Sequence, residues 1–127
     1  MSNTGQILVA DDADALLLPI VDLLRLEGYE CNYVPDIDTV IEILKCIKFD
    51  LLIADINTVG VSTVEIIKGL PDNSKEISII LISDFPLSEK LLQSMKPLVT
   101  ACLSKPPDIE ELLKYVKCSI KEKLMRA

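Results

Sequence analysis

Short apolar runs alternate with longer amphipathic segments along the chain. The runs are rich in Ile, Leu and Val, which is typical of strands buried on both faces of a parallel sheet. The segments between them carry apolar residues at helical spacing, which predicts helices that cover the two faces of that sheet. The pattern predicts strands near residues 6–10, 30–34, 50–55, 77–82 and 99–103. It predicts helices near residues 14–27, 37–48, 62–70, 87–95 and 108–124.

Several single residues mark where these helices begin, bend and end. The first helix stops at Gly28, a residue type that commonly follows a helix end. Pro19 falls inside this predicted helix, where a proline removes one backbone hydrogen bond, so we expect a bend there. Asp36 or Asp38 is expected to cap the second helix. Asp108 is expected to begin the last one.

Polar residues stand where four of the apolar runs end. Asp11 and Asp12 follow the first run, and Asp55 closes the third. Ser83 follows the fourth run, and Lys105 comes just after the fifth. Open α/β sheets form their ligand crevices at the carboxyl ends of the strands. We therefore expect three carboxylates, a hydroxyl and an ammonium group to meet at one edge of the sheet.

This set of groups has a definite chemistry. Three neighbouring carboxylates repel one another unless a cation neutralises them. Oxygen ligands favour a hard ion such as Mg²⁺, which needs few protein ligands and keeps several waters. A lysine suits a phosphate as a point charge, and a serine hydroxyl can donate to a phosphoryl oxygen. Since aspartate can act as a covalent nucleophile, the set predicts a site that holds Mg²⁺ and accepts a phosphoryl group on a carboxylate.

The motifs, taken together, resemble those of response-regulator receiver domains of two-component signalling, the single-domain chemotaxis regulators among them. The resemblance extends from about Gln6 to the last predicted helix. It implies a flavodoxin-like, doubly wound (βα)₅ fold with a five-stranded parallel sheet in the order 2-1-3-4-5.

The resemblance also implies a role for each residue at the sheet edge. Asp55 would accept the phosphoryl group, with Ser83 as the switch hydroxyl and Lys105 as the cation that pairs with the phosphate. The implied Mg²⁺ ligands are Asp11, Asp12, Asp55 and the backbone carbonyl of Asn57. Because the chain contains no histidine, a phosphohistidine donor must come from a partner, either a sensor histidine kinase or a phosphotransfer protein. The implied contact surface for a downstream protein target is residues 84–124.

Several positions depart from the family pattern. Asp84 follows the switch hydroxyl where a small residue is usual, Thr63 stands where a glycine is usual, and Cys102 replaces an aromatic residue. These departures keep open an alternative, a degenerate receiver that is never phosphorylated and acts as a protein-binding scaffold. A third hypothesis, an aspartate-type phosphatase, needs a second acid near the nucleophile. Asn57 cannot supply that acid, so we expect no enzymatic activity.

Composition narrows the class further. A length of 127 residues predicts one domain over residues 1–127, with no output domain in this chain. A net charge of −7 without a basic block argues against nucleic acid and anionic membranes as partners. The first residues, Met1 to Gly5, lack the pattern of a signal peptide, so a cytoplasmic location is expected. Four scattered cysteines and the lack of histidine argue against zinc and predict reduced, buried thiols.

Overall fold

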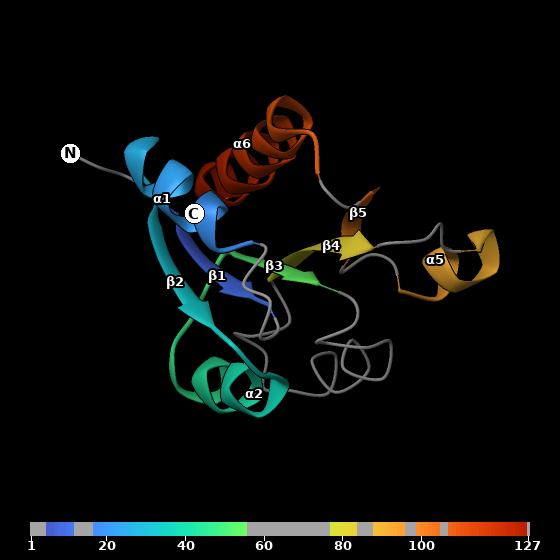
Figure 1. The fold of residues 1–127 in the computed structure, drawn as a ribbon, viewed down its shortest axis with the longest axis horizontal. Helices are drawn as coiled ribbons and strands as arrows, with labels where there is room; N and C mark the ends of the chain where they lie inside the picture. The colour runs from blue at the N-terminus through green and yellow to red at the C-terminus, as the bar shows by residue number, and fades with distance from the viewer. Residues whose placement is uncertain are drawn as a thin grey trace.

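The structure of the chain is a computed structural model, and it describes residues 5–11, 17–55, 77–83, 88–95, 99–104 and 107–126. Within these residues, parallel strands form one five-stranded sheet in the order β2-β1-β3-β4-β5 (Figure 1). The strands are β1 (Gln6–Ala10), β2 (Glu30–Val34), β3 (Leu51–Asp55), β4 (Ser78–Ser83) and β5 (Val99–Ser104). The predicted parallel fold and strand order are confirmed.

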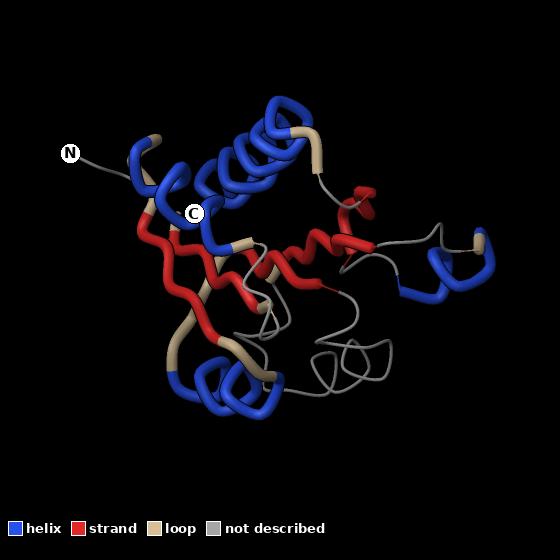
Figure 2. Tube along the Cα trace, in the orientation of Figure 1, coloured by secondary structure: helices blue, strands red, loops and turns tan. Residues whose placement is uncertain are grey.

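Helices lie on both faces of this sheet. The described helices are α1 (Leu18–Leu26), α2 (Ile37–Cys46), α5 (Glu89–Met95) and α6 (Ile109–Arg126). Figure 1 and Figure 2 show α1 and α6 on one face and α2 on the other, with α5 to the side, beyond β4. The helix predicted at residues 62–70 lies outside the described residues.

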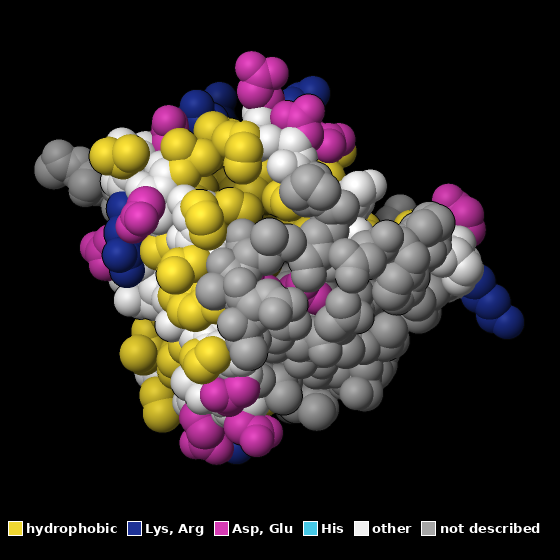
Figure 3. Space-filling view, in the orientation of Figure 1, with side chains coloured by type: hydrophobic (Ala, Val, Ile, Leu, Met, Phe, Trp, Pro, Cys, Tyr) yellow, Lys and Arg dark blue, Asp and Glu magenta, His cyan; other side chains and the backbone are white. Residues whose placement is uncertain are grey.

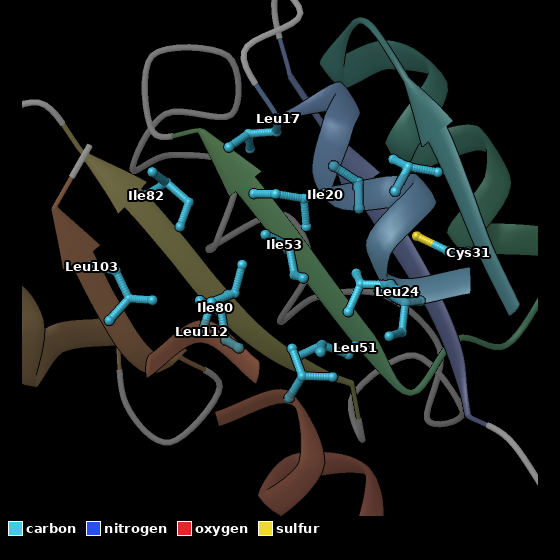
Figure 4. Close-up of a cluster of buried hydrophobic side chains, with 14 of the residues drawn as sticks. Leu17, Ile20, Leu24, Cys31, Leu51, Ile53, Ile80, Ile82, Leu103 and Leu112 are labelled. Carbon is cyan, nitrogen blue, oxygen red and sulfur yellow. The ribbon is translucent and has the colours of Figure 1, made fainter. Parts of the chain in front are cut away.

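Alternate strand residues fill two hydrophobic cores, one on each face of the sheet. The core on the α1 and α6 face includes Ile7, Val9, Leu51, Ile53, Ile80 and Ile82. The core on the α2 face includes Leu8, Ala10, Leu52, Ala54, Ile79 and Leu81. Figure 4 shows Leu17, Ile20 and Leu24 packed beside β3 in the first core. Burial of one such Leu or Ile side chain contributes about 1.5–3 kcal/mol, so these cores hold the sheet without covalent cross-links.

The cysteines agree only partly with the expectation. All four are free. Cys31 is buried and Cys102 is half-buried, but Cys46 and Cys118 are exposed, so the prediction of buried thiols is wrong for these two. Cys46 ends α2, and Cys118 lies two residues before the buried Ile120 on α6, which turns it away from the sheet.

The described start of α1 decides the place of Pro19 in the helix. The described helix begins at Leu18, with Leu17 as its N-cap, and the predicted start near residue 14 lies outside the described residues. Pro19 therefore lies in the first turn, where its missing N–H is not needed, and the predicted bend inside the helix is wrong. The predicted end is confirmed, because Gly28 follows the helix with a φ of 102°, in the left-handed region that favours glycine.

Aspartate side chains cap α2 and α6. At α2, Asp36 Oδ1 accepts hydrogen bonds from the Thr39 amide (2.8 Å) and the Thr39 hydroxyl (2.7 Å). These bonds lower the pKa of the Asp36 carboxyl below its usual value. At α6, Asp108 Oδ1 accepts a hydrogen bond from the Glu110 amide at 2.9 Å. Of the two caps that the sequence allowed for α2, Asp36 is the one observed, and α6 begins directly after Asp108 as predicted.

The amino-terminal edge of the sheet is held by the backbone and side chain of one residue. The Gln6 amide donates to Asp50 Oδ2 at 2.8 Å, and the Asp50 amide donates back to the Gln6 carbonyl at 2.9 Å. The Ser78 amide donates to the Asp50 carbonyl at 3.1 Å. Asp50 therefore aligns β1, β3 and β4 at the end opposite the predicted site, which helps to fix the strand register there.

The outer strand β2 is tied to α1 by an arginine. Arg25 near the end of α1 donates to the Cys31 carbonyl from Nε at 3.0 Å and from Nη2 at 2.7 Å. Burial raises the pKa of the Cys31 thiol to about 11, and the nearby Arg25 guanidinium opposes that rise. Cys31 is therefore a protonated packing residue near neutral pH.

Acidic side chains lie over the beginnings of two of the described helices. Figure 3 shows acidic side chains over α2 and over the start of α6, where Asp38, Glu110 and Glu111 lie in the first turns of the helices. Carboxylates in a first turn interact favourably with the helix dipole. Among the described helices, none combines the length and apolar character that a transmembrane segment requires.

Candidate functional site

The strand register brings two predicted aspartates together. Ala10 of β1 is paired with Ala54 of β3. Asp11 directly follows Ala10, and Asp55 follows Ala54 as the last residue of β3, so the two aspartates lie side by side at the carboxyl end of the sheet. Both residues are fully buried. Two buried carboxylates in neighbouring strands repel each other, and a bound cation would offset that repulsion.

The predicted switch hydroxyl lies on the other side of Asp55. Asp55 is paired with Ile82 of β4, and Ser83 follows as the last residue of that strand, 2 % exposed. Ser83 is paired in turn with Ser104 of β5. Thus the carboxylates and the hydroxyl occupy the ends of three adjacent strands, as the sequence predicted.

Three of the predicted site residues lie outside the described residues. Asp12 follows Asp11 directly, and Asn57 is two residues beyond Asp55. Lys105 follows Ser104, whose place beside Ser83 is fixed by the register. Their roles remain predictions, which the sequence and the positions of their chain neighbours support.

The described side chains at this site offer oxygen ligands that suit Mg²⁺. Among the described residues, which leave out Asp12, no group of three His, Cys, Asp or Glu side chains could hold a metal ion. Mg²⁺ does not require such a group, because one or two carboxylates together with waters are sufficient. Asp11 and Asp55 supply two carboxylates in buried, adjacent positions. The described part of the site therefore fits a magnesium ion and carries none of the soft ligands that favour zinc.

One contact of Asp11 could not be read from the strand pattern. The Leu17 amide donates a hydrogen bond to Asp11 Oδ2 at 2.5 Å, across six positions of the chain. Leu17 is the N-cap of α1, so the carboxylate is joined to the start of that helix. Pro19, which is favoured in the first turn of a helix, is the sequence signal that could have located this start.

Cys102, which stands where the family usually has an aromatic residue, borders a hollow. Cys102 of β5 is half-buried and packs against the core on the α2 face, as expected for a small packing residue. A hollow of about 200 Å³ lies between α5 and β5. Its lining includes Leu92, Val99, Cys102 and the polar residues Glu89 and Gln93. Burial raises the pKa of the Cys102 thiol, so the thiol is protonated near neutral pH.

A parallel sheet in this order, with buried carboxylates ending β1 and β3 and a buried hydroxyl ending β4, defines a receiver domain of the two-component type. The family model described as the response regulator receiver domain matches residues 7–117. The chain therefore belongs to the response regulator receiver domain family. No curated protein gives a significant match to the sequence.

Solved structures of receiver domains share the fold. The chain is similar to a CheY-like receiver domain protein from Methanospirillum hungatei JF-1, with a TM-score of 0.83, 21 % identity, and coverage of 98 % of this chain and 100 % of that chain. It is similar to the chemotaxis response regulator CheY4 of Vibrio cholerae, with a TM-score of 0.80, 20 % identity, and coverage of 93 % and 100 %.

A third similar structure is the receiver domain of the sensor histidine kinase PA1611 from Pseudomonas aeruginosa PAO1. Its TM-score is 0.78 at 20 % identity, and the match covers 94 % of this chain and 99 % of that chain. That structure has a magnesium ion coordinated in its active-site cleft.

Proposed function

We propose that the chain is a phospho-accepting response regulator whose phosphoacceptor is Asp55. The observation that carries this proposal is the buried pair Asp11 and Asp55 at the ends of adjacent strands, with Ser83 at the end of the next strand. Burial of two repelling carboxylates costs free energy, which a purely structural role would not require. A cation and a phosphoryl group at this place would account for both carboxylates and the hydroxyl.

The transfer itself moves one phosphoryl group. In the donor, a histidine kinase or a phosphotransfer protein, the bond between a histidine nitrogen and phosphorus breaks. A bond forms between an Asp55 carboxylate oxygen and phosphorus, which gives an acyl phosphate. Ser83 would donate a hydrogen bond from its hydroxyl to a phosphoryl oxygen, and Lys105 would pair with the phosphoryl charge.

Magnesium would supply charge neutralisation for the carboxylates and the incoming phosphoryl group. Asp11, Asp12, Asp55 and the Asn57 carbonyl would hold it. The phosphorylated state would then change contacts with a downstream protein through residues 84–124, which include the described α5 and β5 and most of α6. We place this activity in the cytoplasm and regard residues 1–127 as one receiver domain without enzymatic activity on other substrates.

Acetyl phosphate labelling tests the phosphoacceptor. The chain incubated with acetyl phosphate and Mg²⁺ should gain one phosphate by intact-mass spectrometry, and Asp55→Asn should remove the label. The matched control is Asp50→Asn, which alters a carboxylate at the opposite end of the same strands and should leave labelling unchanged. Persistence of the label in Asp55→Asn would overturn the assignment.

The competing function is that of an unphosphorylated scaffold. Cys102 favours it, because the family's aromatic rotamer switch cannot operate at a position without a ring. Asp84 and Thr63, which lie outside the described residues, point the same way. No label in the wild-type chain at saturating acetyl phosphate and Mg²⁺, together with an intact fold, would favour the scaffold.

A further inference from the structure

Asp11 makes a contact that its expected metal role does not explain. Its Oδ2 accepts the hydrogen bond from the Leu17 amide at 2.5 Å, and both residues are fully buried. The Asp11 amide donates to the Val34 carbonyl at 3.1 Å, which fixes the backbone of Asp11 beside the end of β2. The carboxylate is therefore held between the sheet and the start of α1.

The start of α1 depends on this carboxylate. Leu17, the N-cap of α1, provides no side-chain cap, and Pro19 in the first turn has no N–H to donate. Asp11 thus acts as a remote cap, and an anion at this place interacts favourably with the positive end of the helix dipole. The Leu17 side chain is buried in the core, close to the carboxyl end of β3 (Figure 4). Any change at the Leu17 amide therefore acts on a residue that is packed against the sheet.

We infer that Asp11 is a positioning residue that couples metal binding to the start of α1. The inference rests on the proposed function in one respect, the role of Asp11 as a Mg²⁺ ligand. A cation bound to the Asp11 carboxylate withdraws negative charge from the acceptor of the Leu17 hydrogen bond. The same cation repels the positive end of α1. Both effects weaken the cap, so Mg²⁺ loosens the start of α1.

Thermodynamic linkage makes the coupling reciprocal. If Mg²⁺ weakens the cap, then any partner that stabilises the start of α1 must weaken Mg²⁺ binding by the same factor. Leu18 and Pro19 lie at this start and are exposed, so a partner can reach them. Metal occupancy and contact at this end of α1 therefore act on each other through one carboxylate.

The chain carries its own control for this coupling. Asp36 caps α2 through the Thr39 amide with the same chemistry, an aspartate oxygen that accepts from a backbone N–H. Asp36 lies on the loop after β2, is exposed, and is not part of the predicted metal site. A general effect of Mg²⁺ on aspartate caps would change Thr39 as well as Leu17.

Amide hydrogen exchange followed by NMR measures the coupling. Saturating Mg²⁺ should speed exchange of the Leu17 amide about fivefold or more, the lower end of typical allosteric coupling. Exchange at Thr39 should not change. The Asp55 amide shift reports Mg²⁺ binding in the same samples. A Leu17 rate that is unchanged or slower while Asp55 reports saturation overturns the coupling alone. No shift at Asp55 and no calorimetric binding overturn both the proposed metal site and the coupling.

Two variants separate the cap from the charge. In Asp11→Asn the side-chain carbonyl can still accept from Leu17, so protection of that amide should persist while Mg²⁺ binding weakens and its effect on Leu17 disappears. In Asp11→Ala both the cap and the metal effect should be lost. An undiminished effect of Mg²⁺ on Leu17 in Asp11→Asn would overturn the inference. This test remains available if Asp11→Ala fails to fold.

Discussion

Ser83 of β4 and Ser104 of β5 are paired across the edge of the sheet, one residue beyond the pair formed by Ile82 and Leu103. Ser83 is buried, whereas Ser104 is exposed. Only Ser83 follows the residue that is paired with Asp55. The two serines therefore form a matched pair of hydroxyls, of which one belongs to the proposed site and the other lies beside it.

This pair allows a test of the switch hydroxyl. Beryllofluoride with Mg²⁺, a stand-in for the phosphoryl group, should shift amides at the site and in residues 85–103. Ser83→Ala should reduce the shifts in 85–103 by removing a coupling worth about 1–3 kcal/mol, without unfolding the chain. Ser104→Ala should leave the shifts unchanged. If wild-type shifts never reach 85–103, the chain does not switch through that face.

Removal of one buried carboxylate should stabilise the metal-free chain. Asp55→Asn abolishes the repulsion between Asp11 and Asp55, and we expect the free energy of unfolding to rise by about 1–3 kcal/mol in the absence of Mg²⁺. Urea denaturation with and without saturating Mg²⁺ measures this. This gain in the free energy of unfolding should be smaller when Mg²⁺ is present, because the ion binds the wild-type pair of Asp11 and Asp55 more tightly than it binds the variant. A loss of stability in metal-free Asp55→Asn would contradict the repulsion argument.

Gly5 is required by close packing against α6. A Cβ added to Gly5 would lie 2.7 Å from Ile120 Cγ2 and would also overlap Ile120 Cδ1. Since Ile120 is buried, Gly5→Ala should lower the free energy of unfolding by about 1–3 kcal/mol.

A double-mutant cycle separates this overlap from a general effect on the chain end. In the Ile120→Ala background, Gly5→Ala should cost much less, because the overlapping atoms are gone. Equal costs in both backgrounds, measured by urea denaturation, would show that the contact is not the cause.

Cys31 should make stability depend on alkaline pH. Burial raises the pKa of its thiol from 9.0 to about 11, so between these values the unfolded chain has lost a proton that the folded chain keeps. The stability that the protonated Cys31 thiol contributes is complete below pH 9 and declines as the pH rises toward 11, by at most about 2.7 kcal/mol, since one pH unit corresponds to about 1.36 kcal/mol. Urea denaturation across this pH range should show that the free energy of unfolding declines less in Cys31→Ala than in the wild type. In the control variant Cys46→Ala, which changes an exposed thiol, the free energy of unfolding should decline with pH as it does in the wild type.

The strands could be predicted closely because burial on both faces leaves a plain apolar signal. The runs around Ile53 and Ile80 end within one residue of the observed strands. Caps at Asp36 and Asp108 could be predicted because side-chain caps are local. The start of α1 could not be predicted in this way, since its cap comes from Asp11 rather than from a neighbour of Leu17 in the chain.

The candidate site shows the same division between local and non-local information. Asp55 and Ser83 follow from single strands, and the register alone then places them together. The pairing of Ser83 with Ser104 of β5 cannot be predicted from the apolar pattern, because the register between β4 and β5 shifts between Val99 and Ala101 and apolar patterns do not encode such a shift. The exposure of the Cys118 thiol does not follow from residue type, because cysteine tolerates either face of a helix.

The hydrogen bonds from Arg25 protect the open edge of the sheet at β2 against pairing with a strand from another copy of the protein. On β2, the Glu30 amide and the Val34 carbonyl bond toward the β1 side, so the Cys31 carbonyl between them faces outward along the open border of the sheet. Arg25 covers that carbonyl with two donors and places a cation there. An incoming strand would have to displace a charged side chain before it could add to the sheet. Continuous sheets built from many copies are therefore disfavoured at this border, and crowded solutions of the protein should resist fibre formation through β2.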